Sequence, residues 1–187
     1  TARNWLRPGL CQQVLDELPI PPDEAAAPVL LSLFSQMEKN SPDWAGWVAQ
    51  LARTEGLPGQ AGAFALENPD ALPELKQVLL YLLYRYLLQS AQDGELLVRV
   101  QAILCCVLFL LLGQVQLWRQ NAVLPPDRRH ALCKEFSKEV EYSDLNLGLL
   151  LQHCHRNPAL SVKSLAALLQ ELHKSWPCCV QSFPAVQ

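Results

Sequence analysis

The chain has little charge for its length. Of its 187 residues, 18% are charged and 50% are hydrophobic, and 15 basic against 18 acidic side chains leave a net charge of −3. A disordered segment needs more charge and less apolar surface, and a domain that binds nucleic acid usually has a pI far above the 5.8 found here. Composition therefore predicts a slightly acidic globular domain, large enough to fold unaided, with no nucleic-acid partner.

Catalytic motifs are absent as well. The sequence contains no Gly-x-Ser-x-Gly, no glycine-rich phosphate loop and no His-Glu-x-x-His. Paired acids such as Asp16-Glu17 lie beside expected helix ends, where acids serve as solvated caps. We therefore expect a protein that is not an enzyme, has no cofactor and takes no small-molecule ligand.

The seven cysteines do not have the spacing of a disulfide framework. Two pairs are adjacent, at 105–106 and 178–179, and there is no Asn-x-Ser/Thr glycosylation site. The chain starts at Thr1 with neither an initiator Met nor an apolar leader. We expect a segment of a longer intracellular protein, in the cytoplasm or nucleus, with reduced thiols.

A structural zinc site is one alternative for some of these cysteines. Zinc in such sites has four Cys or His ligands, usually in closely spaced pairs, and no Cys-x-x-Cys is present. We expect Cys133 and Cys154 to be core residues instead, and therefore no metal ligands. The residues that would form the site are His130, Cys133, His153, Cys154, His155, Cys178 and Cys179.

No segment alternates between apolar and polar residues as a half-buried strand does. Helix start and stop signals predict an all-α fold of seven or eight antiparallel helices, in a single domain over 1–177 followed by an irregular tail over 178–187. Ser41, Ser143 and Ser161 are expected N-caps. The glycine-containing segment 56–62 is expected to be a loop. The helices are expected near 8–18, 28–37, 42–55, 74–91, 95–120, 126–140, 144–156 and 161–176.

The two longest apolar segments, 74–91 and 95–120, predict a buried central hairpin, because both are apolar on almost every side. Trp44 and Trp47 fall on the inner stripe of their helix and are expected in the core. The apolar run 102–112 is eleven residues long, whereas a membrane span needs about 18–20, so we expect no membrane partner.

These helices either close into a bundle or stack as helix pairs. The leucine-rich stretches 78–88, 103–112 and 161–176, with proline-marked turns between helices, resemble a HEAT/ARM-type scaffold segment. The resemblance is one of architecture, since no diagnostic motif matches, and no functional residue is transferred from it. It implies a short stack of helix pairs that binds other protein subunits.

Several aromatic residues lie at the ends of the expected helices, where protein interfaces often have their anchors. They either fill the ends of the domain or contact a partner. We predict a non-catalytic interaction or scaffold domain of a larger complex. The alternatives are an autoinhibitory helical domain and a zinc-binding or thiol enzyme. The expected partner-binding residues are Trp118, Tyr142, Trp176 and Phe183.

Overall fold

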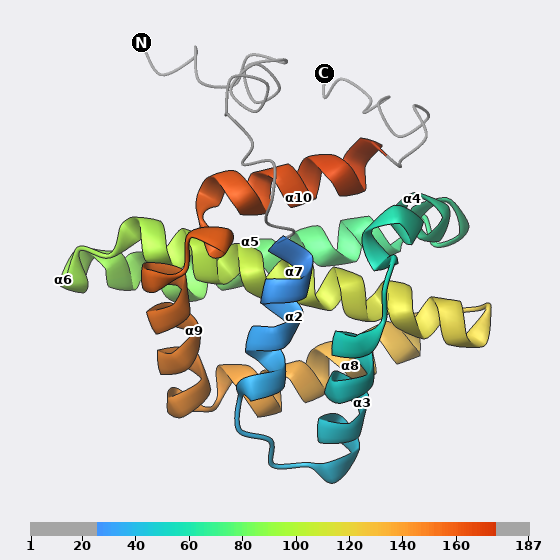
Figure 1. The fold of residues 1–187 in the computed structure, drawn as a ribbon, viewed down its shortest axis with the longest axis horizontal. Coiled ribbons are helices and arrows are strands. Elements are labelled where there is room, and N and C mark those ends of the chain that lie inside the picture. Colours follow the sequence, from blue (N-terminus) through green and yellow to red (C-terminus); the bar gives the residue numbers. More distant parts are fainter. Residues whose placement is uncertain (1–25, 175–187) are drawn as a thin grey trace.

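One long helix, α7 (Leu96–Asn121), lies at the centre of the molecule (Figure 1). A computed structural model describes residues 26–174 of the chain. Within that part, α7 contacts α2, α4, α5, α6, α8, α9 and α10. Because its middle is apolar on every side, it can be surrounded by other helices without burying charge.

The described residues contain no β-strand, so the all-α prediction is confirmed, as a helical bundle with eight helices of eleven residues or more. α5 and α10 run roughly along α7, while α2, α3 and α9 run across it (Figure 1). Besides α7, the elements are α2 (Ala26–Gln36), α3 (Pro42–Arg53), α4 (Leu57–Glu67), α5 (Ala71–Tyr86), η2 (Leu87–Gln89), α6 (Ser90–Asp93), α8 (Pro126–Phe136), η3 (Ser137–Glu141), α9 (Asp144–Arg156), η4 (Pro158–Leu160) and α10 (Val162–Lys174).

Phe109, in the middle of α7, is the centre of an aromatic core. Its ring stacks on Phe34 of α2, with ring centres 4.0 Å apart, and lies 6.0 Å from Phe136 of α8. The rings of Trp44 and Trp47 on α3 lie 6.1 and 6.0 Å from it. The prediction of a core position is confirmed for Trp44, while Trp47 is half-buried and packs against the core. Large rings from three outer helices thus surround Phe109 of α7.

The expected caps are confirmed. The hydroxyl oxygens of Ser41, Ser143 and Ser161 each accept a hydrogen bond from the backbone N–H three residues later, at 3.4, 3.3 and 3.2 Å. Each satisfies a donor that the first turn of the helix leaves unpaired. Local chemistry therefore determines where these helices begin.

The prediction of a loop over 56–62 is wrong. Gly56 has a left-handed backbone, with φ +74°, and α4 begins at the next residue. Pro58 fits the first turn, and Leu57, Ala61 and Phe64 are buried on one face of α4. The packing of this face against α7 and α10 outweighs the low helix propensity of the glycines.

α8 continues into η3, a π-helical turn, rather than ending in the regular helix expected through Val140. The N–H of Tyr142 donates to the carbonyl oxygen of Ser137 at 3.0 Å, five residues back. The wider turn changes the directions in which its side chains point: Glu139, Val140 and Glu141 are all buried, while Tyr142 is exposed. Such turns inside helices are frequent at functional sites.

Candidate functional site

The outer face of α5 is apolar and exposed. The expected hairpin is present, since α5 packs along α7, but only three of the sixteen residues of α5 are buried: Ala71, Leu75 and Leu82. Tyr84 is 78% exposed and Leu88, one turn later in η2, is 74% exposed. The expectation that 74–91 is buried on all sides is therefore wrong, because no described helix covers the side of α5 away from α7.

Arg85 lies at the centre of this face. Its guanidinium carbon is 6.0 Å from the ring centre of Tyr81, 5.5 Å from that of Tyr86 and 5.6 Å from that of Tyr142. Tyr142 comes from the end of η3 and is 72% exposed. Three rings thus surround one cation at distances typical of cation–π interactions. We call Tyr81, Arg85, Tyr86, Tyr142 and Glu141 the arginine–tyrosine cluster.

Glu141 is the buried anchor of this cluster. Its side chain is 4% exposed, and its two carboxylate oxygens accept hydrogen bonds from the hydroxyls of Tyr86, at 3.2 Å, and Ser137, at 2.6 Å. The Nε of Arg85 donates to the Tyr86 hydroxyl at 3.1 Å and lies 3.8 Å from Glu141. The π turn that carries Glu141 inward therefore holds α5 against η3 through a buried carboxylate.

Burial raises the pKa of Tyr86 to about 12, and the neighbouring Glu141 charge adds to the shift. Burial likewise raises the pKa of Tyr81, and the hydrogen bond to Tyr86 raises that of Arg85. At neutral pH both phenols are uncharged, and the Tyr86 hydroxyl is a donor to Glu141. The arrangement stabilises a fixed cation on the surface and provides no group poised to exchange a proton near pH 7.

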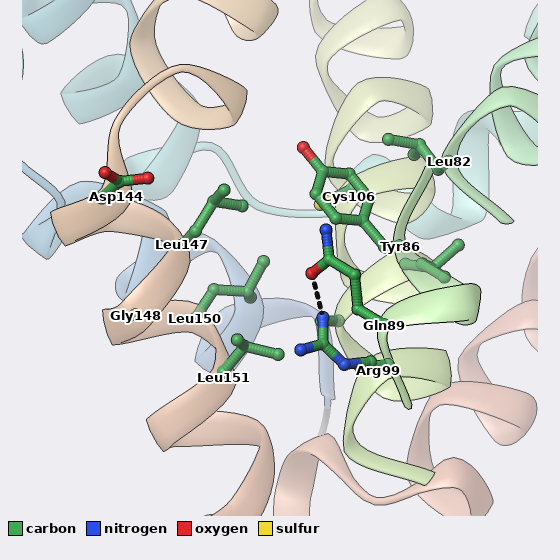
Figure 2. Close-up of a pocket in the computed structure, with 12 residues that line it drawn as sticks. Leu82, Tyr86, Gln89, Arg99, Cys106, Asp144, Leu147, Gly148, Leu150 and Leu151 are labelled. Atoms are coloured by element: carbon green, nitrogen blue, oxygen red, sulfur yellow. Dashed lines mark hydrogen bonds between the residues drawn. The ribbon is translucent and has the colours of Figure 1, made fainter. Parts of the chain in front are cut away.

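A groove of about 270 Å³ lies between α5 and α9, with α7 as its floor (Figure 2). Its floor consists of Ala102, Ile103 and Cys106. Leu82 and Tyr86 of α5 form one wall, and the other wall comes from α9. Both α5 and α9 pack on α7 rather than on each other, which leaves this space between them. The residues of the α9 wall are Asp144, Leu147, Gly148, Leu150 and Leu151.

The end of the groove near α6 is polar. The Nη1 of Arg99 donates to the side-chain oxygen of Gln89 at 2.7 Å (Figure 2), and Arg99 also forms an ion pair with Asp93. A second hollow, of about 370 Å³, lies between α5 and η3 and shares Leu82 with the groove. The middle of α5 therefore packs on α7 through Leu82 and the partly buried Val78, Leu79 and Leu83, with a hollow on each side.

The predicted partner-binding residues fall in different places. Tyr142 belongs to the arginine–tyrosine cluster. Trp118 is half-buried, its ring edge packs on Phe64 at 6.0 Å, and its Nε1 donates to Glu67 at 2.9 Å, so it joins α7 to α4. Trp176 and Phe183 lie outside the described residues, as does the expected tail 178–187.

Sequence reasoning did not identify Tyr81, Tyr84 or Arg85 as surface residues, because it assigned the whole segment to the core. A signal was present in the residue types. Tyrosine and arginine have polar ends that need water or a partner, so two tyrosines and an arginine within five residues of an apolar helix indicate an edge of the core.

The described thiols and histidines do not form a metal-binding group. Among residues 26–174, no group of three His, Cys, Asp or Glu side chains is placed to hold a metal ion. Cys154 is buried, as expected, with its Sγ 4.0 Å from that of Cys105, while Cys133 is half-buried. Burial raises the pKa of Cys133 and of Cys106, and the hydrogen bond to Cys154 and burial raise that of Cys105. The thiols of Cys105, Cys106 and Cys133 are therefore protonated and poor nucleophiles at neutral pH.

Within the described part of the chain, α7 as a whole is long and apolar enough to cross a membrane. The sequence prediction considered only the run 102–112 within it, which is too short for a span. In the structure, 67% of the most apolar window of α7 is buried among the other helices.

Comparison with known proteins finds no matching family model, no matching curated protein and no matching solved structure. The HEAT/ARM resemblance therefore stays a prediction.

Proposed function

We propose that this chain is a non-catalytic protein–protein interaction domain within a larger complex, and that it binds its partner through the arginine–tyrosine cluster and the exposed face of α5. The observation that supports this is the exposure of large apolar side chains around one cation. Tyr142, one of the rings around Arg85, is 72% exposed, and Tyr84, the residue before Arg85 on α5, is 78% exposed, so each presents roughly 150 Å² if a whole tyrosine contributes about 200 Å². Exposed apolar side chains of this size are typical of interaction sites when several of them lie on one face of a protein.

The residue types also support an interaction surface. Tyrosine and arginine, with tryptophan, are enriched among residues that dominate binding energy. Tyrosine has a large contact area and only two flexible torsions, whereas arginine has a charged planar group that can form several hydrogen bonds. Here the Arg85 side chain lies among rings and is bonded to Tyr86, so little of its freedom remains to be lost on binding. The same surface carries no buried acid–base pair with a substrate-sized polar pocket, which is the arrangement that would favour an enzyme.

Site-directed photo-crosslinking in cells tests the proposal. A benzophenone amino acid replaces Tyr84, on the proposed surface, or Leu66, an exposed apolar residue of α4 that is 60% exposed and serves as the control. We expect a discrete cross-linked species from position 84 and not from position 66, and we expect Tyr142→Ser to abolish it. Equal cross-linking from both positions, or none from position 84, would contradict the proposal.

Truncation of the anchors has an expected magnitude. Interface tyrosines that dominate binding cost about 2 kcal/mol or more when cut to alanine, which corresponds to roughly 30-fold in affinity. Tyr84 is exposed and has no described hydrogen bond, so Tyr84→Ala should leave the folded domain intact. Loss of the cross-linked complex with an unchanged unfolding midpoint would separate binding from folding.

A further inference from the structure

The groove between α5 and α9 has the dimensions of a site for side chains rather than for a whole domain. A cavity of about 150 Å³ accommodates a benzene-sized group, so the 270 Å³ here has room for about two such groups. Its floor has small side chains, Ala102 and Cys106, and one wall contains Gly148, where an added Cβ would meet no atom within 4 Å. The groove is therefore open along α9 and is not filled by the protein itself.

The apolar surface continues beyond the groove on both rims. Leu88 follows α5 on one side, and Tyr142 and Leu145 lie at the start of α9 on the other, each more than 70% exposed. A small molecule inside the groove would leave these rims exposed to water. An elongated ligand that lies along the groove would cover them, which favours a segment of polypeptide over a small molecule.

Arg85 indicates the charge of that ligand. Its Nε is bonded to Tyr86, but neither Nη1 nor Nη2 has a hydrogen-bond acceptor among the described residues. Glu141, the nearest carboxylate, is 4% exposed, and both its oxygens already accept hydroxyl hydrogen bonds. The guanidinium thus keeps two nitrogens without a described acceptor, and a guanidinium can bind a carboxylate with two parallel hydrogen bonds.

We propose that the groove binds an amphipathic α-helix of a partner polypeptide, which places apolar side chains between α5 and α9 and an aspartate or glutamate against Arg85. A hydrophobic groove between two helices is the usual receptor for such a helix, whose anchors recur at i, i+3 or i+4 and i+7. Asp144 lies on the opposite wall and has no described ion pair, so the acid of the partner must face Arg85 and not α9. This inference rests on the proposed function and specifies the partner.

Selection and binding with defined peptides test it. A display library of sixteen-residue helical peptides, with leucine at anchor spacing and the remaining positions randomised, is selected on the 187-residue protein. We expect the recovered peptides to be enriched in aspartate or glutamate at one position next to an anchor. No enrichment of an acid at any position would overturn the assignment to Arg85.

The best peptide is then labelled, and its affinity is measured by fluorescence anisotropy. Gly148→Leu fills the groove and should weaken binding at least tenfold. The matched control is Gly46→Leu, since Gly46 is also an exposed glycine inside a helix whose added Cβ meets nothing within 4 Å, but it lies on α3. Equal affinities for the two variants would overturn the location of the site.

The role of Arg85 is measured by a double-mutant cycle. Arg85→Gln should weaken peptide binding about tenfold. Replacing the selected acid of the peptide by its amide should weaken binding to the wild-type protein by the same factor, but should not weaken binding to the Arg85→Gln protein any further. Independent effects of the two changes would refute the ion pair.

The two proposals can fail separately. If no peptide binds while the cross-link from position 84 persists, the helical partner is wrong and the proposed function stands. If the cross-link is also absent, both fail. A cross-link from position 84 to residues 8–18 of the same chain would show that the chain covers its own groove, and would overturn the choice of a separate partner.

Discussion

The ion pair between Arg129 and Glu74 is the contact whose removal has the clearest expected cost. Arg129 of α8 is 3% exposed and donates to both oxygens of Glu74 on α5, each at 2.7 Å, and to the carbonyl oxygen of Leu124 at 2.9 Å. Glu74→Gln keeps the shape of the side chain and removes its charge. The guanidinium then stays buried with a neutral amide as its partner.

Breaking a fully buried pair by removing one charge costs about 3–5 kcal/mol, because the remaining charge is left without compensation. Glu74 is 29% exposed, and glutamine retains one acceptor, so we expect a smaller loss of about 2 kcal/mol in the free energy of unfolding. With a urea dependence of about 2 kcal/mol per molar, the unfolding midpoint should fall by about 1 M.

Glu135→Gln is the matched control, since Glu135 pairs with Lys138 at 2.7 Å on the surface. An exposed pair contributes at most about 0.5 kcal/mol, so its midpoint should hardly move. Equal shifts for the two variants in urea unfolding followed by circular dichroism would refute the reasoning.

The same pair predicts a pH dependence. The hydrogen bond from Arg129 lowers the pKa of Glu74 below its ordinary value of 4.5. The folded protein therefore binds the proton less readily than the unfolded chain, and the stabilisation is complete above pH 4.5 and is lost as the pH falls below it. The advantage of wild type over Glu74→Gln should shrink between pH 7 and pH 3. A constant difference would contradict the assigned cause.

Three further predictions concern folding. The buried side chain of Asn146 forms three hydrogen bonds of 2.7–2.9 Å, two with the backbone of Glu38 and one with that of Glu139. Asn146→Ala should therefore lower the free energy of unfolding by about 2–3 kcal/mol, whereas Asn121→Ala, at an exposed site, should lower it by under about 0.5 kcal/mol. Similar urea midpoints for the two variants would count against the buried network. Gly113→Ala places a Cβ 2.9 Å from the Trp47 ring, so overpacking should outweigh the gain in helix propensity and lower the free energy of unfolding by about 1 kcal/mol. In a Trp47→Phe background, which removes that contact, the same substitution should raise the free energy of unfolding; a loss there as well would refute the assigned clash. Tyr86→Phe should cost about 1–2 kcal/mol at pH 7 through the lost bond to a buried carboxylate. Because the pKa of Tyr86 is raised to about 12, wild type loses stability as the pH rises above 10, and the difference between the two proteins should narrow there; a gap that widens in alkaline unfolding would disprove the assigned burial.

The parts of the fold that depend on neighbouring residues could be predicted from the sequence. Ser41 and Ser143 cap helices as expected, because a cap involves a hydroxyl and a backbone N–H three residues away. The long helix expected over 95–120 is observed as α7, since its apolar residues leave no other way to satisfy the backbone in a buried segment.

The parts of the fold that depend on packing between distant segments could not be predicted from the sequence. The helix α4 forms where Gly56, Gly59 and Gly62 indicate a loop, because its apolar face is buried against α7 and α10, which are both distant in the sequence. The π turn at η3 likewise interrupts a regular spacing of Leu132, Phe136 and Val140. Neither outcome is visible in a window of local sequence.

The amino-acid sequence alone determined that this protein is helical and where most of its helices begin, because capping and periodicity act over three or four residues. Only the tertiary structure decided which side of each apolar helix meets water. Segment 78–88 is almost uniformly apolar, so its sequence cannot say which face packs on α7. The structure assigns one face to α7 and leaves the other exposed around Arg85, because the burial of an apolar surface depends on which helices are close enough to cover it.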